Sequence, residues 1–385
     1  MQERASLFMK AVQVSSTQDK LLQGFSRLPV SVKRTLIKPV MKARYNKALE
    51  LQAPKMLMLY VTDNCNLRCK HCFYWKEVDN PRNAHSIEEI EKLTKSLKEK
   101  LDLLTLTGGE PFIRKDLVDI VRLFVQNNGV RRIHIATNGL LPDLTVRKTQ
   151  EMLALLPEKT RLTMQFSIDG FEDKHDEVRG MKGSFQKTCE TVRKLNEIHD
   201  PRLAVSVATV VHNGNFHEMK DFKYFINHEL GVPMKVNVLR KPSSVRGVAP
   251  QFMEAFDIRE DEGYQPPSED QLRELMGILE DGTIASRIER KKIEHSITIL
   301  HHKKKAVNCL AGIRDATIFS NGDVSICEPT TPFSNLKEFD YNFDTLWHSQ
   351  AAEERKEKLI GKCFCLNSCN LLNAMQFDTE TLVSL

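Results

Sequence analysis

Several features that would narrow the class of this protein are missing from its sequence. No run of apolar residues approaches the length of about eighteen that spans a bilayer, so no transmembrane helix is expected. The N-terminal region has no apolar segment ending in a small-residue cleavage site, so no secretory signal is expected either. Internal repeats and long low-complexity tracts are also absent. The 385 residues are 41% hydrophobic and 28% charged, which predicts two domains or one large domain with attachments.

Excess charge is absent from most of the chain, although the formal net charge is +5. Residues 1–50 hold ten lysines and arginines against three acids, a net charge of +7 that leaves −2 for the remainder. The main body is therefore not expected to bind nucleic acid. Apolar residues from Leu21 to Tyr45 recur at helical spacing, which predicts a basic amphipathic helical extension over 1–52. Such a helix either lies on an anionic membrane surface, through residues 20–50, or packs against the rest of the protein.

Strand and helix patterns alternate from residue 55 onward. The predicted strands cover residues 56–62, 103–107, 132–137, 162–168, 203–211 and 234–239, and helical patterns separate them. Ser86 and Ser268 each begin a capping box, which signals the start of a helix. Six strands with intervening helices predict an α/β fold with a parallel sheet, a partial (β/α)6 TIM-like barrel over 53–245. A loop and helix connection is expected over 246–305, and a small cysteine-rich domain over 306–385.

The strongest chemical signal is a group of three cysteines directly after the first predicted strand. Cys65, Cys69 and Cys72 have the spacing C-x3-C-x2-C. Three thiolates this close can bind one metal centre, and they cannot easily pair off among themselves. Iron–sulfur clusters normally take four thiolates, so a cluster held here has one iron left open, where chemistry can occur. A zinc ion with His71 as its fourth ligand is the alternative reading.

Three more motifs follow this cysteine spacing, and together the four resemble the radical S-adenosylmethionine (SAM) superfamily. Thr107-Gly108-Gly109-Glu110-Pro111 follows the second predicted strand, Thr137-Asn138-Gly139 the third and Ser167-Ile168-Asp169-Gly170 the fourth. The resemblance covers about residues 55–240. All four motifs lie at the C-terminal ends of predicted strands, where parallel α/β folds build their ligand sites from strand-to-helix loops.

The resemblance implies a [4Fe–4S] cluster on Cys65, Cys69 and Cys72, whose open iron is chelated by SAM. It also implies that eight other residues bind SAM. Gly108, Gly109 and Glu110 are expected at the ammonium end, Ser167 and Arg179 at the carboxylate end, His71 and Phe73 beside the adenine, and Asn138 at the ribose or the methionine part. From the residues alone, Arg179 could instead form a surface salt bridge, and Asn138 could be an ordinary turn residue.

Five cysteines near the C-terminus form a second group. Cys309 and Cys327 have the spacing C-x12-G-x4-C around a predicted hairpin with an Asn-Gly turn, and Cys363, Cys365 and Cys369 follow as C-x-C-x3-C. This pattern resembles the SPASM or twitch domain of radical SAM enzymes, shortened from the usual seven cysteines. It implies a second, auxiliary [4Fe–4S] cluster with Cys309 and Cys327 as ligands, while the choice of two among the last three stays open. A zinc site is the alternative.

These resemblances imply a radical SAM enzyme. Such an enzyme takes an electron from a donor such as reduced flavodoxin or ferredoxin, cleaves SAM reductively and uses the resulting 5′-deoxyadenosyl radical to abstract hydrogen from a substrate C–H bond. The substrate stays open among lipid-linked, glycan and peptide molecules. The outcome stays open among oxidation, epimerisation and bond formation.

An iron–sulfur electron-transfer or binding protein that does not cleave SAM is the alternative from another class. The intact Gly108-Gly109-Glu110 sequence argues against it, because electron transfer needs no co-substrate pocket. Nine cysteines without a leader favour a reducing compartment, so the protein is expected in the cytoplasm. Peripheral contact with the inner membrane face is expected only if the N-terminal helix binds lipid.

Overall fold

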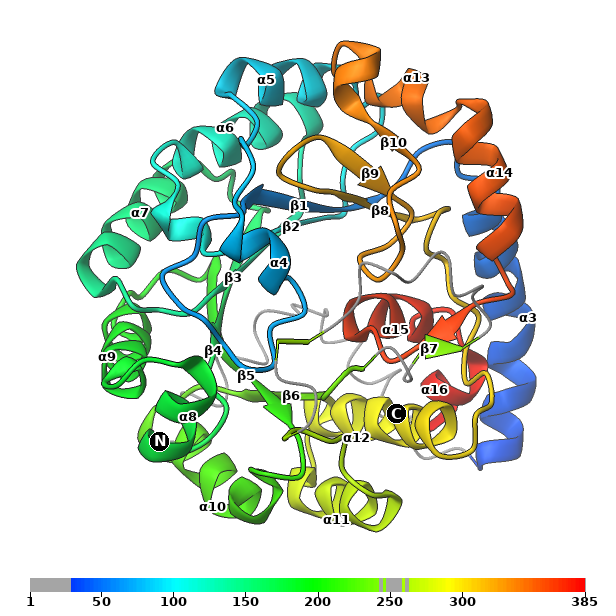
Figure 1. Cartoon of the computed structure of the whole chain (residues 1–385). Helices are drawn as coiled ribbons and strands as arrows, with labels where there is room; N and C mark the ends of the chain where they lie inside the picture. Colours follow the sequence, from blue (N-terminus) through cyan, green and yellow to red (C-terminus); the bar gives the residue numbers. More distant parts are fainter. Residues whose placement is uncertain (1–28, 242–244, 247–257, 260–262, 385) are drawn as a thin grey trace.

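The computed structural model describes residues 29–241, 245–246, 258–259 and 263–384. Its centre is a curved sheet of mainly parallel strands (Figure 1). The six barrel strands pair in chain order, each parallel to the next: β1 (Met56–Thr62), β2 (Leu103–Gly108), β3 (Arg132–Thr137), β4 (Arg161–Ser167), β5 (Leu203–Val211) and β6 (Met234–Val238). The predicted parallel α/β sheet and partial barrel are confirmed.

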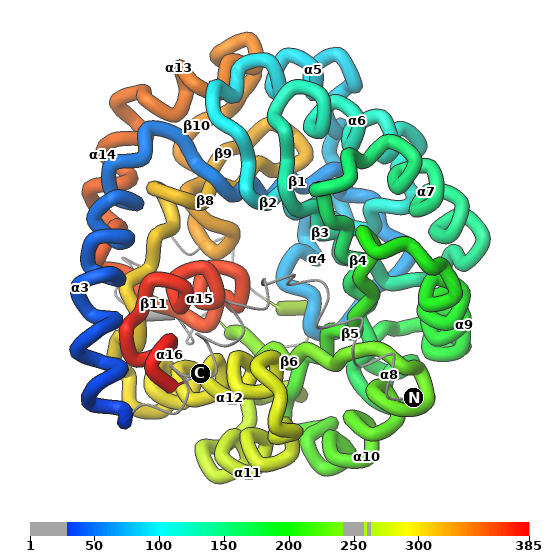
Figure 2. Tube along the Cα trace, turned by 180° about the vertical axis from the view of Figure 1, so that it is seen from behind, coloured from blue at the N-terminus to red at the C-terminus, as the bar shows by residue number. Residues whose placement is uncertain are grey.

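Helices surround the outer side of this sheet (Figures 1 and 2). They are α5 (Ile87–Ser96), α6 (Leu117–Asn128), α7 (Pro142–Leu155), α8 (Glu172–Arg179), α9 (Ser184–Asn196), α10 (Met219–Tyr224) with a π-helical continuation (Phe225–Glu229), α11 (Glu269–Leu279) and α12 (Ile284–Leu300). Alternation along each strand separates the core from the interior of the barrel. In β1, Leu57 and Leu59 join the hydrophobic core, whereas Met58 and Tyr60 face an internal cavity.

The predicted limits of the elements agree closely with the structure. Strands 56–62, 132–137 and 203–211 are reproduced without change, and the other three differ by one residue at one or both ends. Both capping boxes at Ser86 and Ser268 are present. Helices α8 and α12 were not predicted as separate elements.

The C-terminal segment extends the sheet of the barrel. Strand β8 (Asp315–Ile318) lies parallel to β1, β9 (Asp323–Ser325) is antiparallel to β8, and β10 (Ser334–Asn335) is antiparallel to β9. The hairpin predicted at Asn321-Gly322 is therefore present, and Gly322 has a φ of +101° that suits glycine. Because this hairpin shares a sheet with the barrel, the division into domains near residue 306 stays a proposal.

The remaining elements bring the last cysteines back toward the barrel. They are α13 (Phe343–Trp347), α14 (Gln350–Leu359), β11 (Phe364–Cys365), α15 (Ser368–Met375) and α16 (Thr379–Ser384), and α4 (Trp75–Asp79) lies nearer the start of the chain. Strand β11 pairs with β7 (Val245–Arg246), which follows the last barrel strand. The connection after the barrel thus meets the segment that carries the final cysteine pattern.

Helix α3 (Val30–Leu49) is the described part of the predicted N-terminal extension, and residues 1–28 lie outside the described residues. It lies beside α16 (Figures 1 and 2). Met41 and Ala48 of α3 are buried, and Arg34 forms an exposed ion pair with Glu380 of α16 at 2.7 Å. The helix therefore packs against the rest of the protein.

A second strip of α3 stays exposed. Leu36 and Val40 are 52% and 56% exposed, in contrast to Met41 at 3%. Near the end of the helix, burial and then the charge of Cys309 raise the pKa of Tyr45. Within the described ranges, no helix combines the length and the apolar character needed to cross a membrane.

The packing of α3 predicts different costs for substitutions on its two sides. Met41→Ala should lower the free energy of unfolding by about 2–3 kcal/mol, because a buried side chain is lost and a cavity is left. Leu36→Ala on the exposed strip should change it by no more than about 0.5 kcal/mol. Chemical denaturation of the two variants measures both values. Equal losses would show that α3 does not pack through Met41.

Candidate active site

A cavity of about 290 Å³ lies at the C-terminal ends of the barrel strands. All three thiols of the first cysteine group line it, and so do all eight residues that the sequence analysis expected at SAM. Cys369, at the start of α15, also lines this cavity. The parallel arrangement explains the convergence, because it brings the strand-to-helix loops to one end of the sheet.

The segment from Cys65 to Cys72, named the cluster loop here, carries the three thiols. The Leu67 amide donates a hydrogen bond to Cys65 Sγ at 3.4 Å, and Arg179 Nη1 lies 3.7 Å from Cys69 Sγ. Burial raises the pKa of Cys65 and of Cys72 to about 12, so a bound cation is needed to favour their thiolate forms at neutral pH. Among the residues that the structure describes, no three His, Cys, Asp or Glu side chains converge on a single-ion position.

Gly108 and Gly109 are required by a close contact between two backbone segments. The Gly109 amide donates to the Thr62 carbonyl and the Glu110 amide donates to the Asn64 carbonyl, both at 2.8 Å. A Cβ on Gly109 would lie 2.1 Å from Asn64 O, and one on Gly108 would lie 2.2 Å from Thr62 O. Sequence reasoning assigned these glycines to the approach of a ligand; both line the cavity, and their nearest neighbours are residues 62–64, just before the cluster loop.

Glu110 both faces the cavity and fixes a neighbouring loop. It is 1% exposed, and its Oε1 accepts hydrogen bonds from the Phe112 amide at 3.0 Å and the Thr137 hydroxyl at 2.8 Å. Its Oε2 accepts from the Asn138 amide at 2.8 Å. Burial raises the pKa of Glu110, and these hydrogen bonds oppose the rise without cancelling it. The carboxyl group therefore holds the loop after β3 in place.

Asn138 connects that loop to the cluster loop. Its Oδ1 accepts from the Leu140 amide at 3.0 Å, which is the turn geometry expected of an Asn-Gly sequence. Its Nδ2 donates to Asn66 Oδ1 at 2.7 Å. Asn66 was not predicted as a site residue, and its place between two cluster-loop cysteines is the one sequence signal that points to it.

Arg179 lies in a buried ion pair and not in a surface salt bridge. Its Nη2 is 2.7 Å from Oδ2 of Asp169, which is fully buried. Burial alone would raise the pKa of Asp169, but the charges of Arg179 and then His71 lower it to about 2. His71 Nε2 lies 3.7 Å from the same carboxylate, and burial lowers the pKa of His71 to about 4. The imidazole is therefore neutral at pH 7 and turned toward Asp169.

One wall of the cavity was not predicted from the sequence. Glu328 Oε1 accepts from the Tyr60 hydroxyl at 2.7 Å, and its Oε2 accepts from Arg240 Nη1 at 2.8 Å and from Asn367 Nδ2 at 3.0 Å. The Arg240 guanidinium lies over the Phe73 ring, 4.6 Å from its centroid. Ser167 completes the predicted lining residues at the end of β4.

The five C-terminal cysteines separate into two environments. Four of them line one apolar cavity: Cys309, Cys327, Cys363 and Cys365. Cys369 instead lines the larger cavity. The Ala311 amide donates to Cys309 Sγ and the Asn367 amide to Cys365 Sγ, both at 3.4 Å. This repeats the bond at Cys65, and hydrogen bonds to sulfur are among the means by which proteins tune iron–sulfur clusters.

The sequence model of the radical SAM superfamily matches residues 59–226, a range that holds the cluster loop and the three later motifs. The chain therefore carries a radical SAM domain over residues 59–226. Radical SAM domains use a [4Fe–4S] cluster and SAM, so the match indicates an enzyme. The site fits these groups, since three thiols, a buried carboxyl group and a buried guanidinium line one cavity.

Relatives and solved structures extend the similarity beyond this domain. The antilisterial bacteriocin subtilosin biosynthesis protein AlbA of Bacillus subtilis (strain 168) is 25% identical over 354 residues, 87% of this chain and 72% of AlbA. The sporulation killing factor maturation protein SkfB of the same strain is 29% identical over 174 residues, 45% of this chain and only 40% of SkfB. Streptococcus suis SuiB, solved with its precursor peptide SuiA, has a TM-score of 0.56 and 16% identity, covering 87% of this chain and 74% of SuiB. That last likeness shows a shared fold.

The backbone contact in this radical SAM domain predicts a large effect of one methyl group. Gly109→Ala should destabilise the protein by about 2 kcal/mol or more, because the new Cβ forces two backbone segments apart. Gly277→Ala is the matched control, since Gly277 lies exposed in α11 and a Cβ added there would meet no atom within 4 Å. That change should raise stability by about 0.5–1 kcal/mol, as expected for alanine in a helix. Thermal or chemical denaturation compares them, and a neutral Gly109→Ala would contradict the contact.

Proposed function

We propose that this radical SAM enzyme modifies a peptide. The observation that carries the proposal is the match to AlbA, which covers 87% of the chain and so extends well beyond residues 59–226. AlbA and SkfB are named for the biosynthesis and maturation of a bacteriocin and a killing factor, and SuiB was solved with a precursor peptide. Lipid-linked and glycan substrates depend on a membrane role of the N-terminal helix, and α3 packs on the protein through one side.

The cluster loop would hold the [4Fe–4S] cluster through its three thiols, and SAM would bind in the same cavity. When bound, these groups supply a 5′-deoxyadenosyl radical that takes a hydrogen atom from a substrate C–H bond. The chain itself supplies charge and orientation. The Glu110 carboxyl group suits the ammonium of the methionine part, and Arg179 suits its carboxylate, with the Ser167 hydroxyl as a second donor. Asp169 fixes the direction of Arg179.

Two further groups are placed to accept the remaining part of SAM and the substrate. The neutral His71 and the ring of Phe73 flank Cys72 and line the cavity, so they are proposed beside the adenine. Arg240 and Glu328 also line the cavity, and they are proposed to contact the substrate. Reduced flavodoxin or ferredoxin is the proposed electron donor, because radical SAM enzymes require a reductant.

A second [4Fe–4S] cluster is proposed on Cys309, Cys327, Cys363 and Cys365. Their common cavity and the two amide-to-sulfur bonds support this set. Among the last three cysteines, where the sequence left the choice open, the proposed ligands are thus Cys363 and Cys365. Cys369 is left out, because it lines the larger cavity and there lies close enough to Glu328 and Arg240 for their charges to affect its pKa.

The reaction class is tested by the formation of 5′-deoxyadenosine after anaerobic reconstitution and reduction with dithionite. The wild-type chain should form it from SAM, and Cys65→Ala should not, because the cluster loses a thiolate ligand. Cys189→Ala is the matched control: Cys189 is 2% exposed in the core and lines neither cavity. An iron-loaded wild type that forms no 5′-deoxyadenosine would favour the electron-transfer alternative.

The substrate class is tested in the same assay by adding an extract of the cells in which the protein naturally occurs. A peptide substrate should stimulate 5′-deoxyadenosine formation, and treatment of the extract with protease beforehand should remove the stimulation. Stimulation that survives the protease but is lost after lipid extraction or glycosidase treatment would instead support a lipid-linked or glycan substrate.

The auxiliary cluster predicts a difference between two neighbouring cysteines. The reconstituted wild type should hold about eight irons per chain, and Cys365→Ala should reduce this to about four because one [4Fe–4S] cluster loses a ligand. Cys369→Ala should keep about eight. Iron analysis together with Mössbauer spectroscopy measures the content and the cluster type. The reverse pattern would place Cys369 in the cluster and exclude Cys365.

A further inference from the structure

A hydrogen bond joins the two residues that flank the cluster loop, Asp63 and Tyr74. Asp63 lies two residues before Cys65, and Tyr74 lies two residues after Cys72. The Tyr74 hydroxyl donates to Asp63 Oδ1 at 2.5 Å, and Asp63 has no exposed surface. The three thiols thus lie on a loop whose ends are joined by a buried carboxylate.

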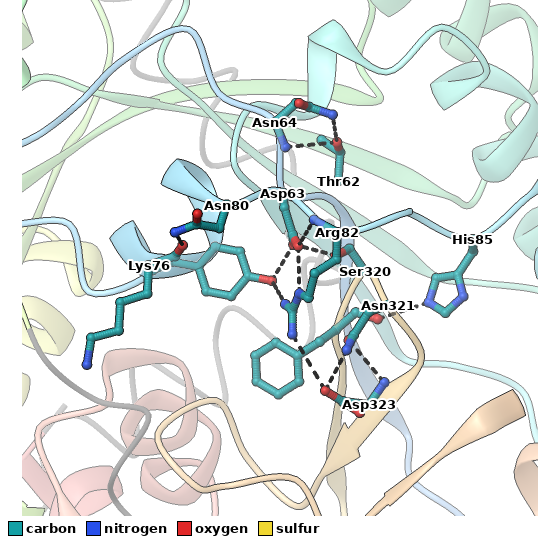
Figure 3. Close-up of polar contacts among 12 residues, drawn as sticks. Thr62, Asp63, Asn64, Lys76, Asn80, Arg82, His85, Ser320, Asn321 and Asp323 are labelled. Atoms are coloured by element: carbon teal, nitrogen blue, oxygen red, sulfur yellow. Dashed lines mark hydrogen bonds and ion pairs between the residues drawn. The ribbon is translucent and has the colours of Figure 1, made fainter. Parts of the chain in front are cut away.

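The same carboxylate receives donors from two other parts of the chain (Figure 3). The backbone amide and Nε of Arg82 donate to Asp63 Oδ2 at 3.1 and 2.8 Å. The hydroxyl of Ser320, which lies between β8 and the hairpin turn, donates to Asp63 Oδ1. Arg82 Nη1 also reaches Asp323 of the same hairpin at 3.6 Å. Asp63 therefore joins the cluster loop to the C-terminal segment.

The neighbours of Asp63 hold a third part of the site. The carbonyls of Thr62 and Asn64 accept the amides of Gly109 and Glu110, both at 2.8 Å. A shift of Asp63 would therefore move the thiols together with residues 108–110, named the GGE loop here. Yet Asp63, Arg82 and Ser320 do not line the cavity, so none of them can touch a molecule bound there.

We propose that Asp63 is a positioning residue through which the C-terminal hairpin sets the place of the cluster loop relative to bound SAM. This inference rests on the proposed function only where it concerns SAM. Aromatic contacts support the same connection between the cluster loop and the hairpin. The centroid of the Tyr74 ring lies 4.6 Å from that of Tyr60 and 6.2 Å from that of Phe319, which precedes Ser320. The hairpin residue Ser320 then influences the SAM site without lining its cavity.

Two substitutions test this role, one at Asp63 beside the cluster loop and one at Ser320 in the C-terminal hairpin. Asp63→Asn keeps the shape but places an amide N–H opposite the Arg82 donor or the hydroxyl donors, so one side of the network is lost. Ser320→Ala removes a single hydroxyl that lies 257 residues away in the chain. Asp340→Asn is the matched control, because Asp340 lies on the same C-terminal segment in an exposed pair with Lys92 at 2.5 Å.

The first readout needs no SAM. Hydrogen–deuterium exchange of the cluster-loop amides should speed up in Asp63→Asn and in Ser320→Ala, and should not change in Asp340→Asn. The second readout is SAM affinity of the reconstituted protein by equilibrium dialysis. It should weaken about tenfold in Asp63→Asn and about threefold in Ser320→Ala, with unchanged iron content. The EPR spectrum of the reduced, SAM-bound first cluster should shift in both variants.

A purely structural role would give a different pattern. A lower melting temperature with unchanged loop exchange, SAM affinity and EPR signal would overturn the proposal, and so would faster loop exchange with wild-type SAM affinity. If Asp63→Asn does not fold, Ser320→Ala decides alone. If the wild type binds no SAM, the proposed function fails, and the exchange experiment still decides whether the hairpin positions the loop.

Discussion

The close contact between residues 62–64, which lead into the cluster loop, and the GGE loop is the constraint on which the rest of the site depends. The Glu110 amide meets the Asn64 carbonyl at a distance that leaves no room for a Cβ on Gly109. Glu110 is thereby fixed, and its carboxyl group holds the amide of Asn138. Asn138 returns a hydrogen bond to Asn66 in the cluster loop. The three loops therefore form a closed ring of hydrogen bonds, and a displacement of one loop breaks contacts in the others.

Much of the fold could be predicted because its signals are local. Buried strands of β-branched and aliphatic residues, capping boxes at Ser86 and Ser268 and an Asn-Gly turn each act over a few residues. The pairing of β8 with β1 could not be predicted in this way, since it joins Met56 to Asp315 across most of the chain. Parallel pairing at such a separation leaves no pattern in either segment alone, and so the hairpin was expected to belong to a separate domain.

The candidate site, like the fold, has a part that could be predicted from local patterns and a part that could not. Its predicted site residues could be found because cysteines and glycines at fixed spacing are rare, and each of them lines one of the two cavities. Asp63 and Glu328 were not predicted as site residues, because a single acidic residue has no distinguishing pattern. Asp169 was noted only as part of the motif after the fourth strand and was given no role. The surroundings of these three residues arise only when distant segments pack, as when Tyr60 of β1 donates to Glu328 beside Cys327. For the same reason, the burial of Arg179 could not be read from its neighbours in the sequence.

Three acid–arginine pairs whose carboxylates are buried or nearly buried lie near the two cysteine groups, and the cost of burying charge explains what they do. The pairs are Asp63 with Arg82, Asp169 with Arg179, and Glu328 with Arg240. Apolar residues of similar volume would stabilise a core equally well or better, because removing charges from water is expensive. Each pair also takes a hydrogen bond from a further group, the Tyr74 hydroxyl, the Val210 amide or the Tyr60 hydroxyl. Apolar packing permits small sliding movements, whereas these directional contacts hold the loops that carry the thiols at fixed positions. The buried charges are therefore best understood as fixing the geometry of the cavity and not as the source of the fold's stability.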